Sequence, residues 1–260
     1  RMLCCLSKPT EGDATLSGAS IVREPMHVKE KIGVSPQETA VAANLTAEEN
    51  LRLMCGMHGL SRAETDEKVR ALSERFHLNE VLSRRAGKLS GGWQRRLSIA
   101  MALVSSPRVL FLDEPTSGLD PESAQNVNSL IQEQAAEGTT VFLCTHQLRY
   151  AQEICTTYGL MNKGHLFAAG TLAQLRAMVC RNTKVRVKAS RMPEGMAYRE
   201  IGEHIYEIDA AAENEIPQIV KRIMDAGGNL YHVSEEKMSL EEIYFPLIDS
   251  AHEETEREQS

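Results

Sequence analysis

A short apolar strand that ends in two adjacent carboxylates most constrains the fold of this chain. The run Val109-Leu110-Phe111-Leu112 contains no polar residue, which is typical of a strand buried on both faces of a parallel sheet. Asp113 and Glu114 follow it directly, at the edge where parallel α/β sheets bind ligands. Asp113 suits a magnesium ion, and Glu114 suits a base that activates water. The pattern therefore predicts an α/β fold with a site at this edge of the sheet.

Two further motifs flank this strand. Ser90-Gly91-Gly92 precedes it and opens a predicted helix, whose small first residues leave backbone N–H groups free to meet an anion. Taken alone, Ser90 is a plain helix cap. Its distance from Asp113 and Glu114 favours a phosphate contact instead. After the strand comes Ser117-Gly118-Leu119-Asp120, in which Asp120 caps a helix that has proline at its first position.

In this order, the motifs resemble those of the ATP-binding cassette ATPases, the nucleotide-binding subunits of ABC transporters. Ser90-Gly91-Gly92-Trp93-Gln94 resembles their signature motif, although Trp93 replaces the Gln or Glu common in the family and reads as a packing residue. Asp113 and Glu114 match the Walker B aspartate and the catalytic glutamate, and Ser117 to Asp120 match the D-loop. So specific a string predicts a truncated P-loop NTPase sheet of the ABC type with a helical subdomain.

Two more residues take their predicted roles from this resemblance. Gln37 follows the short strand Ile32 to Val34, where the family has its Q-loop glutamine. His146 lies two residues after the predicted strand Thr140 to Cys144, where the family has its H-loop histidine. Without the family spacing, Gln37 is an ordinary loop residue and His146 a satisfied histidine at a strand end.

The resemblance implies a site for ATP and Mg²⁺ that is completed by a second cassette in a head-to-tail dimer. Glu114 and His146 are then the catalytic residues. The predicted nucleotide contacts are Gln37, Ser90, Gly91, Gly92, Gln94 and Asp120, and the predicted magnesium ligands are Asp113 and Gln37.

The phosphate-binding loop of such ATPases has no counterpart in this sequence. No Gly-x-x-x-x-Gly-Lys-Ser/Thr occurs, and the Gly87-Lys88 pair lacks the earlier glycine. The resemblance places Arg1 just downstream of the loop's lysine. We therefore expect a truncated subunit, with a natural shorter product starting at Met2 as the alternative. We also expect this chain alone to bind ATP weakly and to be inactive, with the neighbours of the missing strand left as unpaired, aggregation-prone edges.

Composition shifts predict the domain organisation. Residues 1–178 read as the ATPase domain, with a helical subdomain over about 46–90 that grips the membrane partner in the family. Capping boxes at Thr46/Glu49 and Ser61/Glu64 predict two helices in that subdomain. Residues 182–248 read as a small α+β domain of order ββαβα, similar to the extension of ABC-2-type exporters. Residues 249–260 read as a disordered acidic tail.

Other segments give simpler expectations. Residues 1–7 read as the end of a helix, and 14–22 contain a short strand-like piece. The helix expected from Gly92 to Val104 has one apolar stripe, which would leave Gln94, Arg95 and Ser98 on other faces. Residues 158–168 read as a hairpin that closes the main sheet.

Charge and cysteine content limit the class of protein. A net charge of −7 without a basic stripe argues against a nucleic-acid partner. The 6 cysteines lack metal-ligand or framework spacing and read as reduced thiols. No apolar run approaches the length of a membrane span, so the resemblance implies a peripheral subunit on the cytoplasmic face, bound to a transmembrane permease.

Three functions remain open from the sequence. The first is an ATPase subunit that powers export. The second is a non-catalytic partner that donates its signature motif to another subunit's nucleotide site. The third is a soluble ABC ATPase outside transport, which the absence of a second cassette, a coiled-coil insert or a basic surface disfavours. The resemblance implies that the membrane subunit selects the transported substrate.

Overall fold

The computed structural model describes residues 1–179, 183–210 and 213–258, which form two compact units. The first unit is Arg1–Gln147 and the second is Leu148–Ser260. The α/β class predicted from the sequence is confirmed. The domain division predicted between 178 and 182 falls within the second unit and stays a prediction.

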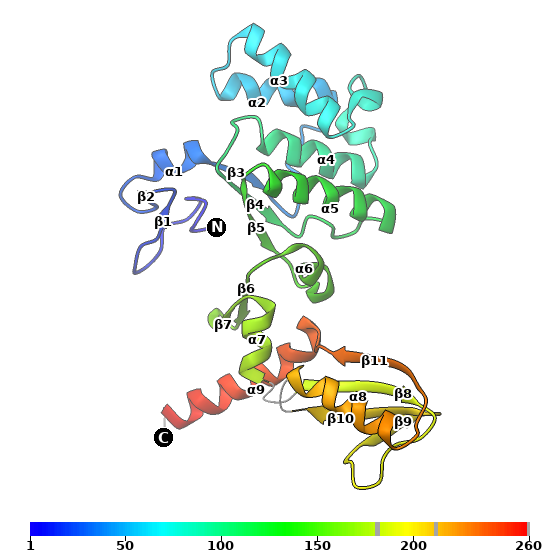
Figure 1. The fold of residues 1–260 in the computed structure, drawn as a ribbon. Coiled ribbons are helices and arrows are strands. Elements are labelled where there is room, and N and C mark those ends of the chain that lie inside the picture. The colour runs from blue at the N-terminus through cyan, green and yellow to red at the C-terminus, as the bar shows by residue number, and fades with distance from the viewer. Residues whose placement is uncertain (180–182, 211–212, 259–260) are drawn as a thin grey trace. The chain divides into compact units, whose positions relative to one another are not determined.

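Three parallel strands organise the first unit (Figure 1). They are β3 (Ile32–Ser35), β4 (Val109–Asp113) and β5 (Thr140–Cys144), in the order β3-β4-β5. The register pairs Ser35 with Leu112 and Asp113 with Cys144, so all three carboxyl ends lie at one edge. Strand β4 is central, and its first four residues are buried, as its uninterrupted apolar run predicts.

Strand β5 has only one neighbour among the described residues and is far more exposed than β4. Its burial alternates between exposed and half-buried positions, and 46% of Phe142 is exposed. A parallel strand with this apolar sequence is usually covered on both faces. The structure thus has an open, apolar sheet edge at β5, of the kind that invites pairing with another strand.

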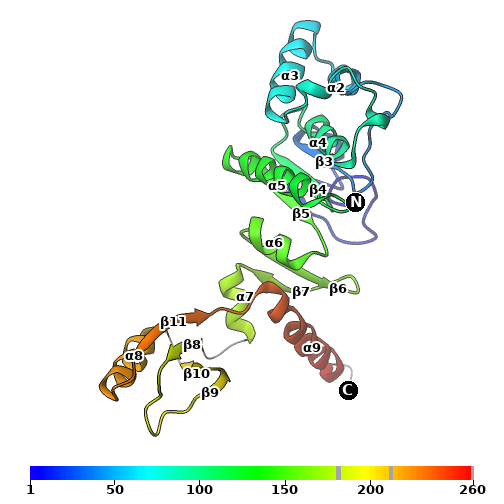
Figure 2. The same ribbon diagram turned by 90° about the vertical axis from the view of Figure 1, so that its right-hand side faces the viewer.

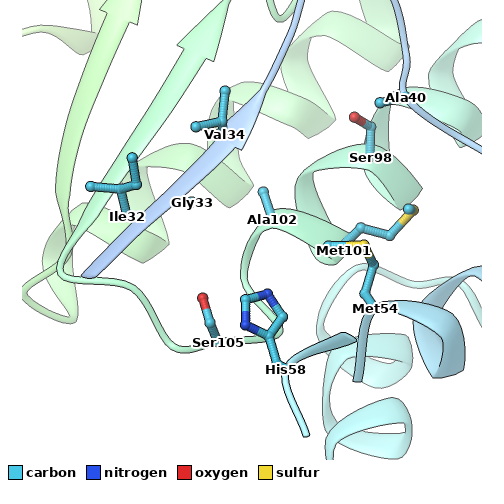
Figure 3. Close-up of a pocket in the computed structure, with 10 residues that line it drawn as sticks. All are labelled: Ile32, Gly33, Val34, Ala40, Met54, His58, Ser98, Met101, Ala102 and Ser105. Carbon is cyan, nitrogen blue, oxygen red and sulfur yellow. The ribbon is translucent and has the colours of Figure 1, made fainter. Parts of the chain in front are cut away.

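Two long helices pack beside this sheet. They are α4 (Gly91–Ala102) and α5 (Pro121–Ala136), which contact each other. Gly33 of β3 lies against the end of α4, where a side-chain carbon would overlap the carbonyl oxygen of Ala102 (Figure 3). The same carbon would lie 3.0 Å from Pro107 Cγ. A glycine is therefore required for β3 and α4 to approach this closely.

A helical insert connects β3 to α4, as predicted. It contains α2 (Ala47–Met57), α3 (Arg62–Arg75) and the 3₁₀ turns Asn79–Val81 and Ala86–Lys88. Both predicted capping boxes are confirmed, because Thr46 and Ser61 each exchange hydrogen bonds with the glutamate three residues later. The fully buried Asn50 holds the preceding loop, since its amide donates to the carbonyls of Ala42 and Thr46.

The N-terminal segment differs from its predicted structure. Residues 1–7 form turns rather than a helix end, with the Cys5 N–H donating to the Met2 carbonyl. The left-handed backbone of Cys5, with φ of +54°, interrupts a right-handed helical path. The piece at 14–22 is a hairpin of β1 (Thr15–Leu16) and β2 (Ala19–Ser20), followed by an unpredicted helix, α1 (Pro25–Lys31).

The second unit begins with a hairpin that has its own apolar core. After α6 (Leu148–Ile154), strands β6 (Tyr158–Asn162) and β7 (His165–Gly170) pair antiparallel, and α7 (Leu172–Val179) follows. The predicted hairpin is confirmed, but it forms a separate two-stranded sheet rather than closing the main one. It packs instead against α7 and the last helix, α9 (Leu240–Glu258).

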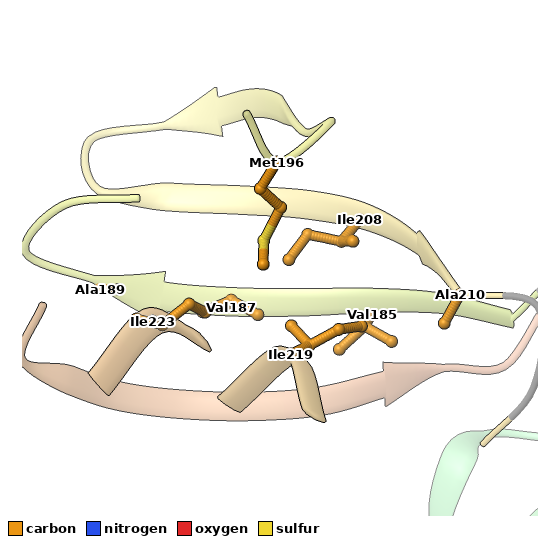
Figure 4. Packing of buried hydrophobic residues seen from close by; sticks show 8 residues of the cluster. All are labelled: Val185, Val187, Ala189, Met196, Ile208, Ala210, Ile219 and Ile223. Carbon is orange, nitrogen blue, oxygen red and sulfur yellow. The ribbon is translucent and has the colours of Figure 1, made fainter. Parts of the chain in front are cut away.

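A four-stranded antiparallel sheet completes the second unit (Figure 2). Its strands are β8 (Thr183–Ala189), β9 (Arg199–Gly202), β10 (Ile205–Ala210) and β11 (Leu230–Glu236), in the order β11-β8-β10-β9. Helix α8 (Ile216–Asp225) packs on this sheet around Ile219 and Ile223 (Figure 4). The predicted order ββαβα misses one strand, because β9 is short and exposed and lacks the buried alternation of its neighbours. A 3₁₀ turn, Glu213–Glu215, precedes α8.

Helix α9 extends beyond the point where the sequence predicts a disordered tail. The structure assigns helix through Glu258, whereas the composition predicts a solvated, disordered segment from residue 249. A helix anchored by Leu240, Ile243 and Leu247 propagates at little cost per residue, which overrides the polar composition. Residues 259–260 and Cys180 lie outside the described part of the chain.

Replacing Gly33 with alanine tests the close contact between β3 and α4. We expect Gly33→Ala to destabilise the chain by about 1–3 kcal/mol, because backbone and a proline ring must move to admit the methyl group. Gly56→Ala is the matched control, since Gly56 is exposed in α2 with nothing near its added carbon. That control should be neutral or stabilising by up to about 1 kcal/mol. Thermal unfolding of both variants measures the difference, and equal unfolding temperatures would contradict it.

Candidate functional site

The carboxyl edge of the three-stranded sheet gathers four of the predicted site residues. Asp113 ends β4 and Glu114 follows it, while His146 lies two residues after the end of β5. Gln37 lies two residues after the end of β3. Parallel pairing in register brings these strand ends to one edge, although the residues come from three distant segments.

Glu114 and His146 are in direct contact. The His146 ring Nδ1 lies 2.6 Å from a Glu114 carboxylate oxygen, and the His146 backbone N–H donates to that oxygen at 2.7 Å. Only 11% of the Glu114 side chain is exposed, compared with 76% for His146. The Glu114 backbone is left-handed, with φ of +45°, which is uncommon for a residue with a side chain. The strand end therefore holds a largely buried carboxylate, carried by a strained backbone, against an accessible imidazole.

Asp113 and Gln37 are accessible at the same edge. Asp113 is the exposed last residue of β4, and the Gln37 side chain is also exposed. Their oxygens are the hard donors that Mg²⁺ prefers, and such ions usually take few protein ligands besides phosphates and water. Among the described residues there is no cluster of three or more metal-ligating acids, histidines or cysteines. The donor set therefore fits a magnesium ion that is held together with a phosphate ligand.

The N-terminus of α4 lies open at Ser90. Ser90 is its N-cap residue, but its side chain makes no capping hydrogen bond, and Gly91 is exposed. The first N–H groups of a helix lack partners within the helix, so they are available to an anion here. By contrast, the Gln94 side chain is engaged internally, donating to the Leu89 carbonyl and accepting from Thr39.

The N-terminus of α4 lies in close contact with the start of α5. A side-chain carbon at Gly92 would lie 2.6 Å from Ser123 Oγ and 2.9 Å from Ser123 Cβ. Asp120 caps α5, as predicted, and accepts from the Ser123 N–H at 2.9 Å. This hydrogen bond and that of the Ser123 side chain lower the pKa of the Asp120 carboxyl. Gly92 therefore permits the predicted signature and D-loop segments to lie together.

Three residues at or behind this site have no role predicted from the sequence. Thr145 donates to the second Glu114 oxygen at 3.0 Å, a role that its place before His146 could have indicated. Arg95 and Ser98, which the sequence places off the apolar stripe of the helix, are nevertheless buried. Arg95 donates to the carbonyls of Pro36 and Gln37, and these hydrogen bonds offset the cost of burying its charge. Burial lowers the pKa of the Arg95 guanidinium, and Asp113 partly opposes this.

Trp93 packs differently from the predicted stripe. Its ring is half-buried and stacks under the guanidinium of Arg96, whose central carbon lies 4.5 Å from the ring centre. Such a cation–π contact stabilises two neighbouring side chains on the helix surface.

A pocket of about 240 Å³ lies behind the sheet rather than at this edge (Figure 3). It is bordered by β3, the end of α4 and residues Met54 and His58 of the helical insert. None of the predicted site residues lines it.

Alanine substitutions at the two adjacent glycines should differ in their effect on the stability of the fold. Gly92→Ala should destabilise the chain by about 1–3 kcal/mol, because its methyl group overlaps Ser123. Gly91→Ala should leave stability nearly unchanged, because its nearest neighbour would be Leu119 at an ordinary 3.6 Å. Chemical denaturation measures both values.

A double variant controls for other effects of Gly92→Ala. Adding Ser123→Gly removes the overlapping atoms, so the two changes together should cost less than the sum of their separate effects. Simple additivity would show that Ser123 does not cause the destabilisation.

Comparison with known proteins agrees with the motifs. A family model described as "ABC transporter" matches residues 1–117. The daunorubicin/doxorubicin resistance ATP-binding protein DrrA of Streptomyces peucetius is 36% identical over 182 residues, covering 70% of this chain and 55% of DrrA. The ABC transporter ATP-binding protein NatA of Bacillus subtilis is 33% identical over 176 residues, covering 67% of this chain and 72% of NatA.

A solved structure shares the fold. It is a dimeric post-hydrolysis state of the ATP-binding cassette MJ0796 bound to ADP and Pi, with a TM-score of 0.59 and 25% identity. The match covers 65% of this chain and 77% of that one. The chain spans only about half the length of DrrA, so DrrA also contains regions that this match does not reach. The identity to NatA over most of NatA's length, together with the matching family model, shows that this chain belongs to the ABC transporter ATP-binding family.

Proposed function

We propose that this chain is the ATP-binding and ATP-hydrolysing subunit of a transporter that powers export through a separate membrane subunit. The observation that carries the proposal is the contact of 2.6 Å between Glu114 and His146. It joins a carboxylate and an imidazole at the carboxyl edge of a parallel sheet, where phosphoryl-transfer enzymes place the groups that orient the attacking water.

Each residue at the edge has a role that its position supports. Glu114 orients and polarises the attacking water, and Thr145 and His146 hold its carboxylate in place. The exposed ring of His146 and the amide of Gln37 are free to contact the terminal phosphate. In this reaction class, catalysis is largely positioning and charge stabilisation.

The residues present fit one part of a magnesium–ATP site. Asp113 and Gln37 supply oxygen ligands for the ion, which would neutralise charge on the phosphates when bound. The 260 residues contain no phosphate-loop pattern, so the cradle around the phosphates is not supplied by a segment of this sequence.

The open end of α4 supports a paired arrangement of two cassettes. Ser90 and Gly91 are exposed at this helix N-terminus, where a nucleotide held by a second cassette could meet the N–H groups of the first turn. Asp120 lies in the adjoining segment. The MJ0796 cassette is dimeric by its description, which agrees with this arrangement. We infer an ATPase dimer in which each chain contributes to the other's site.

A membrane subunit is inferred from the family and from the helical insert of this chain. None of the helices in the described part of the chain has an apolar stretch of the length needed to cross a bilayer. We propose that the insert containing α2 and α3 docks on a permease at the cytoplasmic face of the membrane, and that no nucleic acid takes part. The drug-resistance name of DrrA favours export over import.

Glu114→Gln, made in the full-length gene product, tests the proposed hydrolysis. We expect kcat for ATP hydrolysis to fall at least about 100-fold with little change in ATP affinity, because the amide cannot accept the water's proton. Glu133→Gln on the exposed face of α5 is the control and should hydrolyse ATP like the wild type. A steady-state phosphate-release assay measures both.

The same assay distinguishes the non-catalytic alternative. If this chain only completes another subunit's site, hydrolysis by the complex will survive Glu114→Gln but fall on Ser90→Ala. Ser90→Ala should fold normally, because the hydroxyl makes no capping bond. Unchanged hydrolysis in both variants would contradict both functions.

A further inference from the structure

The segment that carries Gln37 is tied to α4 at three successive points. The Ser35 hydroxyl lies 2.9 Å from that of Ser98, in a buried contact. The Thr39 hydroxyl donates to Gln94 Oε1 at 3.3 Å. Between these ties, Arg95 spans residues 36 and 37, so three side chains within one turn of α4 hold consecutive parts of the segment.

Arg95 makes the central tie with both arms of its guanidinium. Nη1 donates to the Pro36 carbonyl at 2.7 Å, and Nη2 donates to the Gln37 carbonyl at 2.5 Å. The planar fork suits two neighbouring acceptors, whereas a lysine ammonium lacks this fixed geometry. The bonds fix the Gln37 backbone while its side chain stays exposed at the sheet edge.

Burial of Arg95 at this position is unfavourable for the free energy of folding. Only 4% of it is exposed, and its Nε is buried without a partner. No ion pair found among the described residues includes it, so the two carbonyls are its direct partners, and the Asp113 carboxylate favours its charge from beyond ion-pair distance. A buried charge without an ionic partner costs stability unless it is well hydrogen-bonded. An apolar side chain would fill the space at lower cost, but it would leave two carbonyls without donors.

We propose that Arg95 is a positioning residue that locks the Gln37 segment to the helix that begins at Gly91. The inference rests on the proposed function, in which Gln37 contacts the nucleotide of its own cassette and α4 contacts that of the second. Through Arg95, a displacement of α4 by the second cassette carries the Gln37 backbone with it. The two nucleotide contacts of one chain then move together.

Backbone order parameters at and after Gln37 test this role in the absence of nucleotide. In the wild type we expect ¹⁵N order parameters near about 0.85 for residues 37–39, and below about 0.6 in Arg95→Met. Arg95→Lys, which retains the charge and one donor group, should give intermediate values. Arg96→Met is the matched control, because Arg96 stacks on Trp93 one residue further along the same helix. Its order parameters at 37–39 should equal those of the wild type.

Two outcomes would overturn the proposal. In the first, Arg95→Met and Arg95→Lys keep wild-type order at residues 37–39. In the second, Arg96→Met loses as much order there as Arg95→Met, which would indicate general loosening of α4. If Arg95→Met does not fold, the comparison of Arg95→Lys with the wild type and Arg96→Met decides the question.

Hydrolysis measurements then separate this proposal from the proposed function. In the full-length gene product, Arg95→Met should lower kcat about 10-fold at a temperature where the variant is fully folded, with partial recovery in Arg95→Lys. If the wild type does not hydrolyse ATP, the proposed function fails, whereas the order parameters still test Arg95. If order is lost at residues 37–39 and kcat is unchanged, Arg95 positions the segment structurally and the coupling to the reaction is refuted.

Discussion

The parallel register of β3, β4 and β5 is the constraint on which the site depends. Because Ser35 pairs with Leu112 and Asp113 pairs with Cys144, the residues that follow each strand emerge at a common edge. Glu114 then meets His146 from the next strand, although 32 residues separate them in sequence. A shift of one residue in either pairing would turn the strand side chains to opposite faces and separate these groups. The chemistry proposed for this chain is therefore a consequence of its sheet register.

Close packing around α4 connects that edge to the rest of the first unit. Gly33 and Gly92 admit backbone and side chains at distances that a methyl group would not allow. Between these contacts, Ser98 bonds the last residue of β3, and Arg95 donates to the two residues that follow it. The helix is thus fixed at its end by one glycine, at its start by another and along its middle by hydrogen bonds. Such a helix transmits displacement as a rigid body, since packed interiors deform little.

Local patterns in the sequence are enough to predict the strand before Asp113 and both capping boxes, because these depend on neighbouring residues. The place of His146 at the same edge as Glu114 is expected only from the resemblance to the ABC ATPases. Burial of Arg95 could not be predicted in this way, because its acceptors are backbone carbonyls of a segment 58 residues away. The same applies to β9, whose pairing with β10 is stabilised by a partner rather than by its own apolar pattern. Tertiary contacts that involve backbone groups leave little trace in composition.

A structure of the protein trapped with Mg²⁺, ADP and vanadate would test most directly whether this edge is the site of phosphoryl transfer. The account predicts that vanadate lies within contact of Glu114, His146 and Gln37, with Asp113 at the magnesium ion. It also predicts that Ser90 and Gly91 of a second cassette face the same vanadate. Vanadate bound away from the carboxyl edge of β3, β4 and β5, or an α4 N-terminus directed away from every nucleotide, would contradict the account.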